Sequence, residues 1–386
     1  MSSTRLNPLD ASWLYTESRE TPMHVGALMP FKLPADAPRD FLRQLMTDLR
    51  RHRQFAPPWN RRLASSILKN PLHSWVEDDA IDLEAHLRHT ALPWPGGERE
   101  LGELIGRLHS QPLDLTRPPW ECTLIEGLEG DRFAFFVKMH HSLIDGVSGM
   151  KLLQRALPAD REKSLDAPPF WAVGLTATGE PRRSARPKPV RDTTTASFAN
   201  AANVAIEALR SQAGTVPQLL MAFGKMMRVT GERDENLRMP FGAPGSILNG
   251  RVRGKRRFAT QAIAMERMRA LAAAADCTLN DLVLATCGGA LRRFLDDSGD
   301  LPEAPITAGI PVSVRPKDDE NTGNAITFII ASLGTDIEDP LERLAGSRRR
   351  LGQPRLDVAR AHACPHRVSL RMIEIVGYPG AHTGRM

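Results

Sequence analysis

The sequence is poor in cysteine and contains no long apolar run. Its four cysteines, in 386 residues, are scattered and form no C-x-x-C pair. Such a pattern fits a reducing cytoplasm better than a disulfide framework or a zinc site. The first residues, MSSTRLNPLDASWLYTE, hold no apolar secretory core, so no export signal is expected. No apolar segment approaches the roughly 18 residues that span a bilayer, so we expect any membrane contact to be peripheral.

Aromatic residues are also few, at 5%, and no recognisable nucleic-acid-binding module is present, so nucleic acid is not expected as a partner. The formal charge is +6, and the cations gather in RVRGKRRF (Arg251–Phe258) and PRRSARPKPVR (Pro181–Arg191). One interpretation of these clusters is a solvated face and a linker. The other is attraction to anionic headgroups or to a phosphate-rich cofactor. The sequence leaves both open.

Helix-like and strand-like segments alternate along the chain, which predicts an α/β protein with mixed sheets rather than a doubly wound parallel sheet. We expect an N-terminal domain over 1–157, an exposed linker over 158–195, a second, partial domain over 196–350, and an atypical tail over 351–386. The predicted strands are 23–33, 120–128, 132–141, 306–314 and 325–333. The predicted helices are 38–52, 99–110, 146–157, 197–230 (broken near 217) and 279–295.

The stretch FVKMHHSLIDG (Phe136–Gly146) places two histidines at the end of an apolar strand. Because side chains alternate along a strand, the imidazoles of His140 and His141 are expected to point in opposite directions. No further ligand stands at a metal-binding spacing, so we expect no metal site. Asp145 could cap the following helix or pair with a cation, and Gly146 allows a tight turn. A rigidly held imidazole of this kind suits a general base.

Residues 140–146 match the HHxxxDG motif of the coenzyme-A-dependent acyltransferase superfamily. Further blocks resemble the bacterial wax ester synthase/diacylglycerol acyltransferase family: LDASWLYTESRETPMHVGAL, LPWPGGERELGELIGRLHSQPLDLTRPPWECTLIEGL, LNDLVLATCGGALRRFL and TAGIPVSVRP. The resemblance covers about residues 6 to 350. It implies two chloramphenicol-acetyltransferase-like domains with a tunnel between them, which acyl-CoA and a lipid acceptor would enter from opposite sides.

The resemblance also implies roles for individual residues. His141 would be the catalytic base, His140 its supporting neighbour, and Asp145 the residue that orients the loop. The residues that would shape the site or support the fold are Gly146, Pro118, Trp120, Asn280, Asp281 and Arg315. Asn280 could be an oxyanion donor or a helix cap, and we favour a structural role. Trp13, Met23 and His24 are interpreted as core and channel wall, and His86 and His89 as surface or structural residues.

The implied function is transfer of a long-chain acyl group from acyl-CoA, a co-substrate, to a fatty alcohol or a diacylglycerol, with no other cofactor. The expected location is cytoplasmic, in peripheral contact with an anionic membrane or with lipid inclusions. After about residue 350 the family pattern stops, and we expect a frameshift or truncation that leaves the second domain incomplete. The alternative function is therefore a non-catalytic, lipid- or membrane-binding remnant of the same family.

Overall fold

The computed structural model describes residues 3–6, 8–64, 73–144, 146–158, 160, 163–164, 167–174, 244–250, 252–313, 326–350 and 371–373. The helices are α1 (Pro8–Thr16), α2 (Phe41–Arg51), α3 (Leu83–His86), α4 (Glu98–Ser110), α5 (Gly146–Ala156), α9 (Met265–Ala274), α10 (Leu279–Asp297) and α11 (Pro340–Arg350), with short 3₁₀ turns η1 (Phe170–Ala172) and η2 (Ile247–Asn249). The strands are β1 (Ser3–Arg5), β2 (His24–Lys32), β3 (Arg61–Leu63), β4 (Ser74–Glu77), β5 (Leu87–Ala91), β6 (Trp120–Leu128), β7 (Arg132–His140), β8 (Thr307–Ser313), β9 (Ile326–Ser332) and β10 (Arg371–Ile373).

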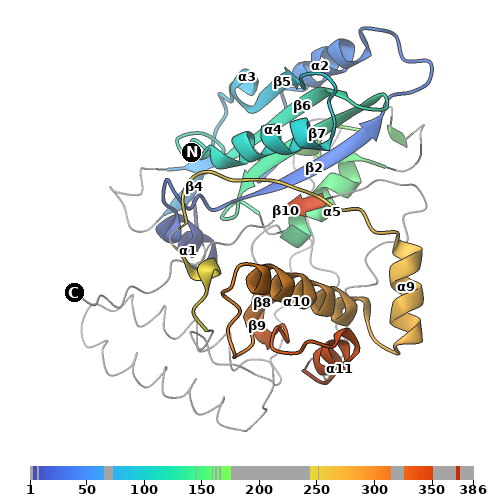
Figure 1. Cartoon of the computed structure of the whole chain (residues 1–386). Helices are drawn as coiled ribbons and strands as arrows, with labels where there is room; N and C mark the ends of the chain where they lie inside the picture. The colour runs from blue at the N-terminus through green and yellow to red at the C-terminus, as the bar shows by residue number, and fades with distance from the viewer. Residues whose placement is uncertain are drawn as a thin grey trace, which may run out of the picture.

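A five-stranded mixed sheet in the order β10-β2-β7-β6-β5 dominates the N-terminal half (Figure 1). Strands β5 and β6 pair in parallel, whereas the pairs β10–β2, β2–β7 and β7–β6 are antiparallel. The predicted mixed sheet is therefore confirmed. A smaller sheet, β1-β4-β3, lies beside it in the same half of the chain.

The two faces of the large sheet bury different helices because residues alternate along β7. Ala134 and Phe136 pack in a cluster with Leu101 and Ile105 of α4, which crosses that face in Figure 1. Residues from α1, α2 and α5 pack with the opposite face, around Val137. The end of β7 is thus enclosed from both sides by helices.

Most predicted elements of this half are confirmed to within a residue or two, β2, β6, β7, α4 and α5 among them. Helix α2 begins at Phe41, three residues later than predicted. The intervening residues form a turn, closed by the Phe41 N–H donating to the Pro38 carbonyl at 3.0 Å. Pro38 therefore begins this turn and does not begin the helix, whose flanking residue is Asp40.

The prediction of an exposed linker over 158–195 is wrong for Phe170–Val173, which are buried. Their backbone and side chains join the N-terminal core. The Trp171 indole N–H donates to the His52 carbonyl at 3.0 Å, and the Trp171 carbonyl accepts from the Ala56 N–H at 2.7 Å. The packing of large aromatic rings outweighs the polar, proline-rich composition around them. The predicted helix 197–230 lies outside the described residues.

The C-terminal half contributes α9, α10, α11 and the antiparallel pair β8–β9, which confirms the predicted strands 306–314 and 325–333. An extended segment, residues 252–264, runs along α4 before α9 begins (Figure 1). Gly102 and Gly106 permit this approach: an added Cβ would lie 2.6 Å and 2.8 Å from the carbonyl oxygens of Phe258 and Arg256. The two halves are therefore in backbone contact along α4.

The tail contributes an element that its sequence pattern does not predict. Strand β10 pairs antiparallel with β2, with Met372 opposite Ala27, and so lies at the edge of the large sheet (Figure 1). Three residues are too few to show a period of two, so pattern reasoning had nothing to detect. Among the described residues, no single helix is long and apolar enough to cross a membrane, while the bent pair α9–α10 passes that test by length and composition only.

Candidate active site

The two histidines lie where β7 ends and a turn begins. His140 is the last residue of the strand, opposite His24 of β2, and His141 is the first residue of the turn. The His140 N–H donates to the Pro119 carbonyl and the His141 N–H to the Met23 carbonyl, each at 2.9 Å. The backbone of the pair is thus tied to the residues that directly precede both neighbouring strands, β2 and β6.

The imidazole of His141 is buried, with 4% of the residue exposed, and it stacks on Trp13 of α1. The ring centroids are 4.0 Å apart and the planes are inclined by 12°. Trp13 was interpreted from the sequence as core or channel wall, and that interpretation missed its contact with the candidate base. Because the indole lies flat on the imidazole, it restricts rotation of the imidazole ring.

His140 is fully buried and has different partners, so the two imidazoles occupy different surroundings. Its Nδ1 accepts from the Ser142 N–H at 3.1 Å and lies 2.6 Å from Ser142 Oγ. A backbone N–H can only donate, so Nδ1 carries the lone pair and, in the neutral ring, Nε2 carries the proton. Nε2 lies 3.4 Å from Glu17 Oε2, an electrostatic contact without the alignment of a hydrogen bond.

Glu17 and Ser142 were not singled out from the sequence. Glu17 directly follows α1, and its Oε1 accepts from the Met23 N–H at 3.2 Å, so one carboxylate bridges β2 and His140. A glutamate seven residues before a strand carries no motif of its own. Ser142 stands inside the HHxxxDG stretch at a position that the motif leaves open, which is why the pattern gave it no weight.

A second buried histidine pair lies on the α4 side of the sheet. The His24 Nε2–H donates to the His109 carbonyl at 2.9 Å, and the two rings meet edge to face at 4.6 Å. Burial, and then the charges of His109 and Lys138, lower the pKa of His24 to about 2. Burial, Lys138 and Arg256 lower the pKa of His109 to about 4. Both imidazoles are neutral at physiological pH, which suits wall residues better than proton carriers.

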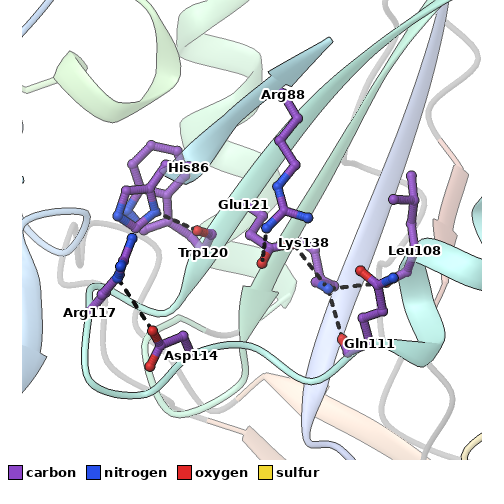
Figure 2. A network of polar contacts seen from close by, with 9 residues as sticks. All are labelled: His86, Arg88, Leu108, Gln111, Asp114, Arg117, Trp120, Glu121 and Lys138. Carbon is purple, nitrogen blue, oxygen red and sulfur yellow. Dashed lines mark hydrogen bonds and ion pairs between the residues drawn. The ribbon is translucent and has the colours of Figure 1, made fainter. Parts of the chain in front are cut away.

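Lys138 joins the sheet to α4 through a buried polar network (Figure 2). Its Nζ donates to the carbonyls of Leu108 and Gln111 at 3.1 and 2.8 Å and lies 3.2 Å from Glu121 Oε2. Glu121 also pairs with Arg88 at 3.1 Å. The ammonium thereby satisfies carbonyls at the C-terminus of α4, where the helix dipole favours a cation. Burial outweighs the pairing with Glu121 and lowers the pKa of Lys138.

The PPWE block, residues Pro118–Glu121, has a structural role next to this network. Trp120 is buried, and its indole N–H donates to the Trp59 carbonyl at 2.8 Å. Its own carbonyl accepts from His86 Nδ1 at 2.7 Å, and the two rings stack, which gives His86 the structural role expected of it. Pro118 precedes Pro119, whose carbonyl holds the His140 backbone. The block therefore supports the histidine turn without contributing a side chain to it.

Residues 6–283 match the model of the wax ester synthase/diacylglycerol acyltransferase catalytic domain. The chain belongs to this family. It is an acyltransferase, as the matched catalytic domain and relatives named as O-acyltransferases show, and the histidine turn lies within the matched residues.

Relatives of this acyltransferase cover most of its length. A Mycobacterium tuberculosis protein, named provisionally as a diacylglycerol O-acyltransferase, is 44% identical over 369 residues, covering 89% of this chain and 72% of the relative. A Mycobacterium bovis protein with the same provisional name is 36% identical over 97% of this chain and 79% of its own length. This second alignment extends past residue 350, whereas the first covers 89% of the chain, and the expected frameshift or truncation stays a prediction.

The solved wax ester synthase/diacylglycerol acyltransferase of Marinobacter aquaeolei VT8 superimposes with a TM-score of 0.65 at 34% identity, covering 90% of this chain and 71% of that one. Together with the mixed five-stranded sheet, this superposition confirms the expected α/β fold class.

The remaining predicted residues have separate outcomes. Asp145 and Arg315 lie outside the described residues, so their proposed pairing stays a prediction, and Gly146 is the first residue of α5. Asn280 is not the cap of α10. The cap is Thr278, whose Oγ1 accepts from the Asp281 N–H at 3.2 Å, while the Asp281 carboxylate accepts from Thr278 in return. Asp281 therefore has a structural role.

Metal binding has no support in the described parts of the chain. Within them, no group of three or more histidine, cysteine, aspartate or glutamate side chains is arranged to hold a metal ion. The four buried histidines of this region have separate partners. His24 contacts His109 of α4, whereas His140 contacts Ser142 of the turn and His141 contacts Trp13 of α1.

Proposed function

We propose that this chain transfers a long-chain acyl group from acyl-CoA to the hydroxyl of a fatty alcohol or a diacylglycerol. The observation that carries the proposal is the buried His141, held in a turn between a backbone tether to Met23 and the flat face of Trp13. Membership of the family supplies the substrate classes. Acyl-CoA is a co-substrate, and the chemistry requires no further cofactor.

His141 would act as a general base. It takes the hydroxyl proton of the acceptor while the hydroxyl oxygen attacks the thioester carbonyl, because an alcohol is a weak nucleophile until a base removes that proton. The tetrahedral intermediate then collapses, the carbon–sulfur bond breaks, and the CoA thiolate takes the proton back from His141. The products are an ester and free CoA, and the imidazole is regenerated. The thioester is already activated, so no covalent enzyme intermediate is needed.

Burial of His141 suits this chemistry for a second reason. Water at the site would compete with the alcohol for the thioester, and enclosure by α1 and the turn limits its access. An acceptor with a long hydrocarbon chain would lose its own hydration on entering such a site, which favours apolar over short, polar alcohols.

The test is turnover of palmitoyl-CoA by the purified chain, with hexadecanol and then a diacylglycerol as acceptor. Free CoA thiol and the ester should appear in equal amounts with the parent protein. His141→Ala should abolish both, and the matched control His52→Ala, which removes an exposed imidazole, should retain them. A folded parent protein that releases no CoA and forms no ester would refute the acyl-transfer proposal and favour the lipid-binding alternative.

We also propose that the basic segment 252–257 contacts an anionic lipid surface at the cytoplasmic face of a membrane or on lipid inclusions. The segment is extended, and Arg253, Lys255 and Arg257 are exposed at alternate positions. Arg256 points inward instead, donating to the carbonyls of Glu20 and Arg253. Three cations in a row on one side of an extended chain match a surface of lipid phosphates.

Sedimentation with vesicles of mixed phosphatidylglycerol and phosphatidylcholine tests this contact. Binding should weaken sharply as sodium chloride rises from 50 to 500 mM, because exposed charges are screened within about 10 Å at 0.1 M salt. Arg253→Glu/Arg257→Glu should bind less than Arg267→Glu/Arg269→Glu, which makes the same change of charge at exposed positions on α9. Equal binding by both variants would remove this segment as the contact.

A further inference from the structure

The end of α1 and the residue that follows it lie against the histidine turn through two side chains, Trp13 and Glu17. Helix α1 begins with Pro8 and has Asp10 in its first turn, both favourable at a helix N-terminus. Leu14 is 2% exposed and anchors the helix in the core. Trp13 lies in the second half of α1 and Glu17 directly follows the helix, and the two side chains contact His141 and His140 respectively.

Glu17 closes a ring of contacts around the base. Its Oε1 accepts from the Met23 N–H at 3.2 Å, and the Met23 carbonyl accepts from the His141 N–H at 2.9 Å. His141 is bonded to His140, whose Nε2 returns to Glu17 Oε2 at 3.4 Å. The ring joins α1, the start of β2 and the end of β7, so a displacement of any one of them moves the turn that holds His141.

The loop between α1 and β2 is itself fixed, which makes the ring rigid. Ser18 and Thr21 exchange backbone hydrogen bonds at 3.1 Å, and their hydroxyls lie 2.6 Å apart. The Arg256 guanidinium, from the segment along α4, donates to the Glu20 carbonyl at 2.9 Å. Glu17 therefore stands between a buried helix and a pinned loop.

Trp13 acts on the other imidazole. A general base becomes an imidazolium when it accepts the hydroxyl proton, and a cation above the face of an indole is attracted to the ring. The indole of Trp13 is close enough to His141 for this attraction, since the two ring centroids are 4.0 Å apart. The same contact fixes the ring plane, so it both orients the base and favours the charged form that exists during the reaction.

We propose that Trp13 and Glu17 are positioning residues for acyl transfer. Trp13 acts by stacking on the face of His141, and Glu17 acts through its contacts with Met23 and His140, which hold the histidine turn in place. The inference rests on the proposed function of His141 as the base. Neither residue would exchange a proton with substrate, so each would change kcat more than KM.

Kinetics of paired variants tests the proposal. Trp13→Leu should lower kcat by about 2- to 30-fold, the range that a cation–π contact supports, with little change in KM. Trp13→Phe keeps an aromatic face and should recover most of the loss. Glu17→Gln retains an acceptor for the Met23 N–H and should lose less than Glu17→Ala, which removes both contacts. Unchanged melting temperatures would separate these effects from loss of fold.

A spectroscopic readout tests the stack independently of turnover. With histidine labelled at Cε1, the His141 resonance should be displaced by the ring current of the indole, and His141→Gln identifies the peak. Trp13→Leu should move that peak toward the position of a solvated histidine, whereas Trp13→Phe should move it less. A peak that stays in place in Trp13→Leu would overturn the stacked geometry and the proposal with it.

The acyl-transfer proposal and the positioning proposal fail in different ways. If the parent is active, His141→Ala is inactive, and Trp13→Leu and Glu17→Ala keep the kcat of the parent, acyl transfer stands and the positioning inference is wrong. If the parent forms no ester, both are wrong. A loss of kcat that Trp13→Phe restores, together with the displaced His141 peak, would establish the positioning role.

Discussion

Acidifying the protein from pH 7 to pH 5 should destabilise its N-terminal half because of the buried pair His24 and His109. Their pKa values in the folded chain are about 2 and about 4, against an ordinary value of 6.5. Between these folded values and 6.5 the unfolded chain binds more protons than the folded one, so the free energy of unfolding falls as the pH falls. The window opens near pH 6.5 and closes for His109 near pH 4.

The size of the effect follows from the same values. One pKa unit corresponds to about 1.4 kcal/mol. Between pH 7 and pH 5, each of the two histidines should therefore remove about 2 kcal/mol from the free energy of unfolding, or about 4 kcal/mol together. Both side chains are at least 95% buried, so solvent does little to weaken the effect. Such a loss is a large part of the stability of an ordinary domain.

Urea unfolding followed by tryptophan fluorescence would measure this loss selectively. All six tryptophans lie within the first 171 residues, so their emission reports on the N-terminal half. His109→Gln should reduce the difference between pH 7 and pH 5 by about 2 kcal/mol. The His109 carbonyl, which accepts from His24, is unaffected by this change. The exposed His52→Gln serves as the control and should leave the difference as it is in the parent.

A pH 5 midpoint equal to that at pH 7 would refute the reasoning, since it would mean that the two imidazoles gain protons in the folded chain without penalty. A loss that persists in full in His109→Gln would place the titrating groups elsewhere.

Three further predictions concern a buried polar network, a close backbone approach and a helix cap. Lys138→Met should destabilise the N-terminal half by about 3 kcal/mol, because it leaves the Glu121 carboxylate without its cation and the Leu108 and Gln111 carbonyls without their donor. Urea unfolding measures this loss, and an unchanged midpoint would contradict it. Gly288→Ala should destabilise the C-terminal half by more than about 1 kcal/mol, since the new Cβ would lie 2.0 Å from the Leu333 carbonyl oxygen. Gly149→Ala is the control: its nearest contact would be an ordinary 3.5 Å, so it should be neutral or stabilising. Thermal melting monitored by circular dichroism measures both. Thr278→Ala should lower the free energy of unfolding of the C-terminal half by about 1 kcal/mol, because it removes the N-cap of α10. Thr278→Ser, which keeps the hydroxyl, should restore the stability, and the same melting experiment measures both.

Local patterns were sufficient where a segment's structure depends on its own residues. The alternation in RFAFFVKMHH placed both histidines at the end of β7, and the spacing of leucines in RELGELIGRLHS located α4. Both follow from the periods of strand and helix, which any apolar pattern must match to bury one face. The HHxxxDG match then identified His141 as the candidate base. Pattern failed at Phe170–Val173, where composition suggested solvent and aromatic packing decided otherwise.

The sequence by itself determined the fold class, the order of the elements and the place of His140 and His141, because these depend on short-range periodicity and on a local motif. Only the tertiary structure decided what surrounds them. It placed Trp13 and Glu17, more than one hundred residues earlier, against the histidine turn, buried Lys138 beneath the end of α4, and added β10 to the edge of the sheet. These contacts depend on how distant elements pack, and no spacing along the chain encodes such a distance.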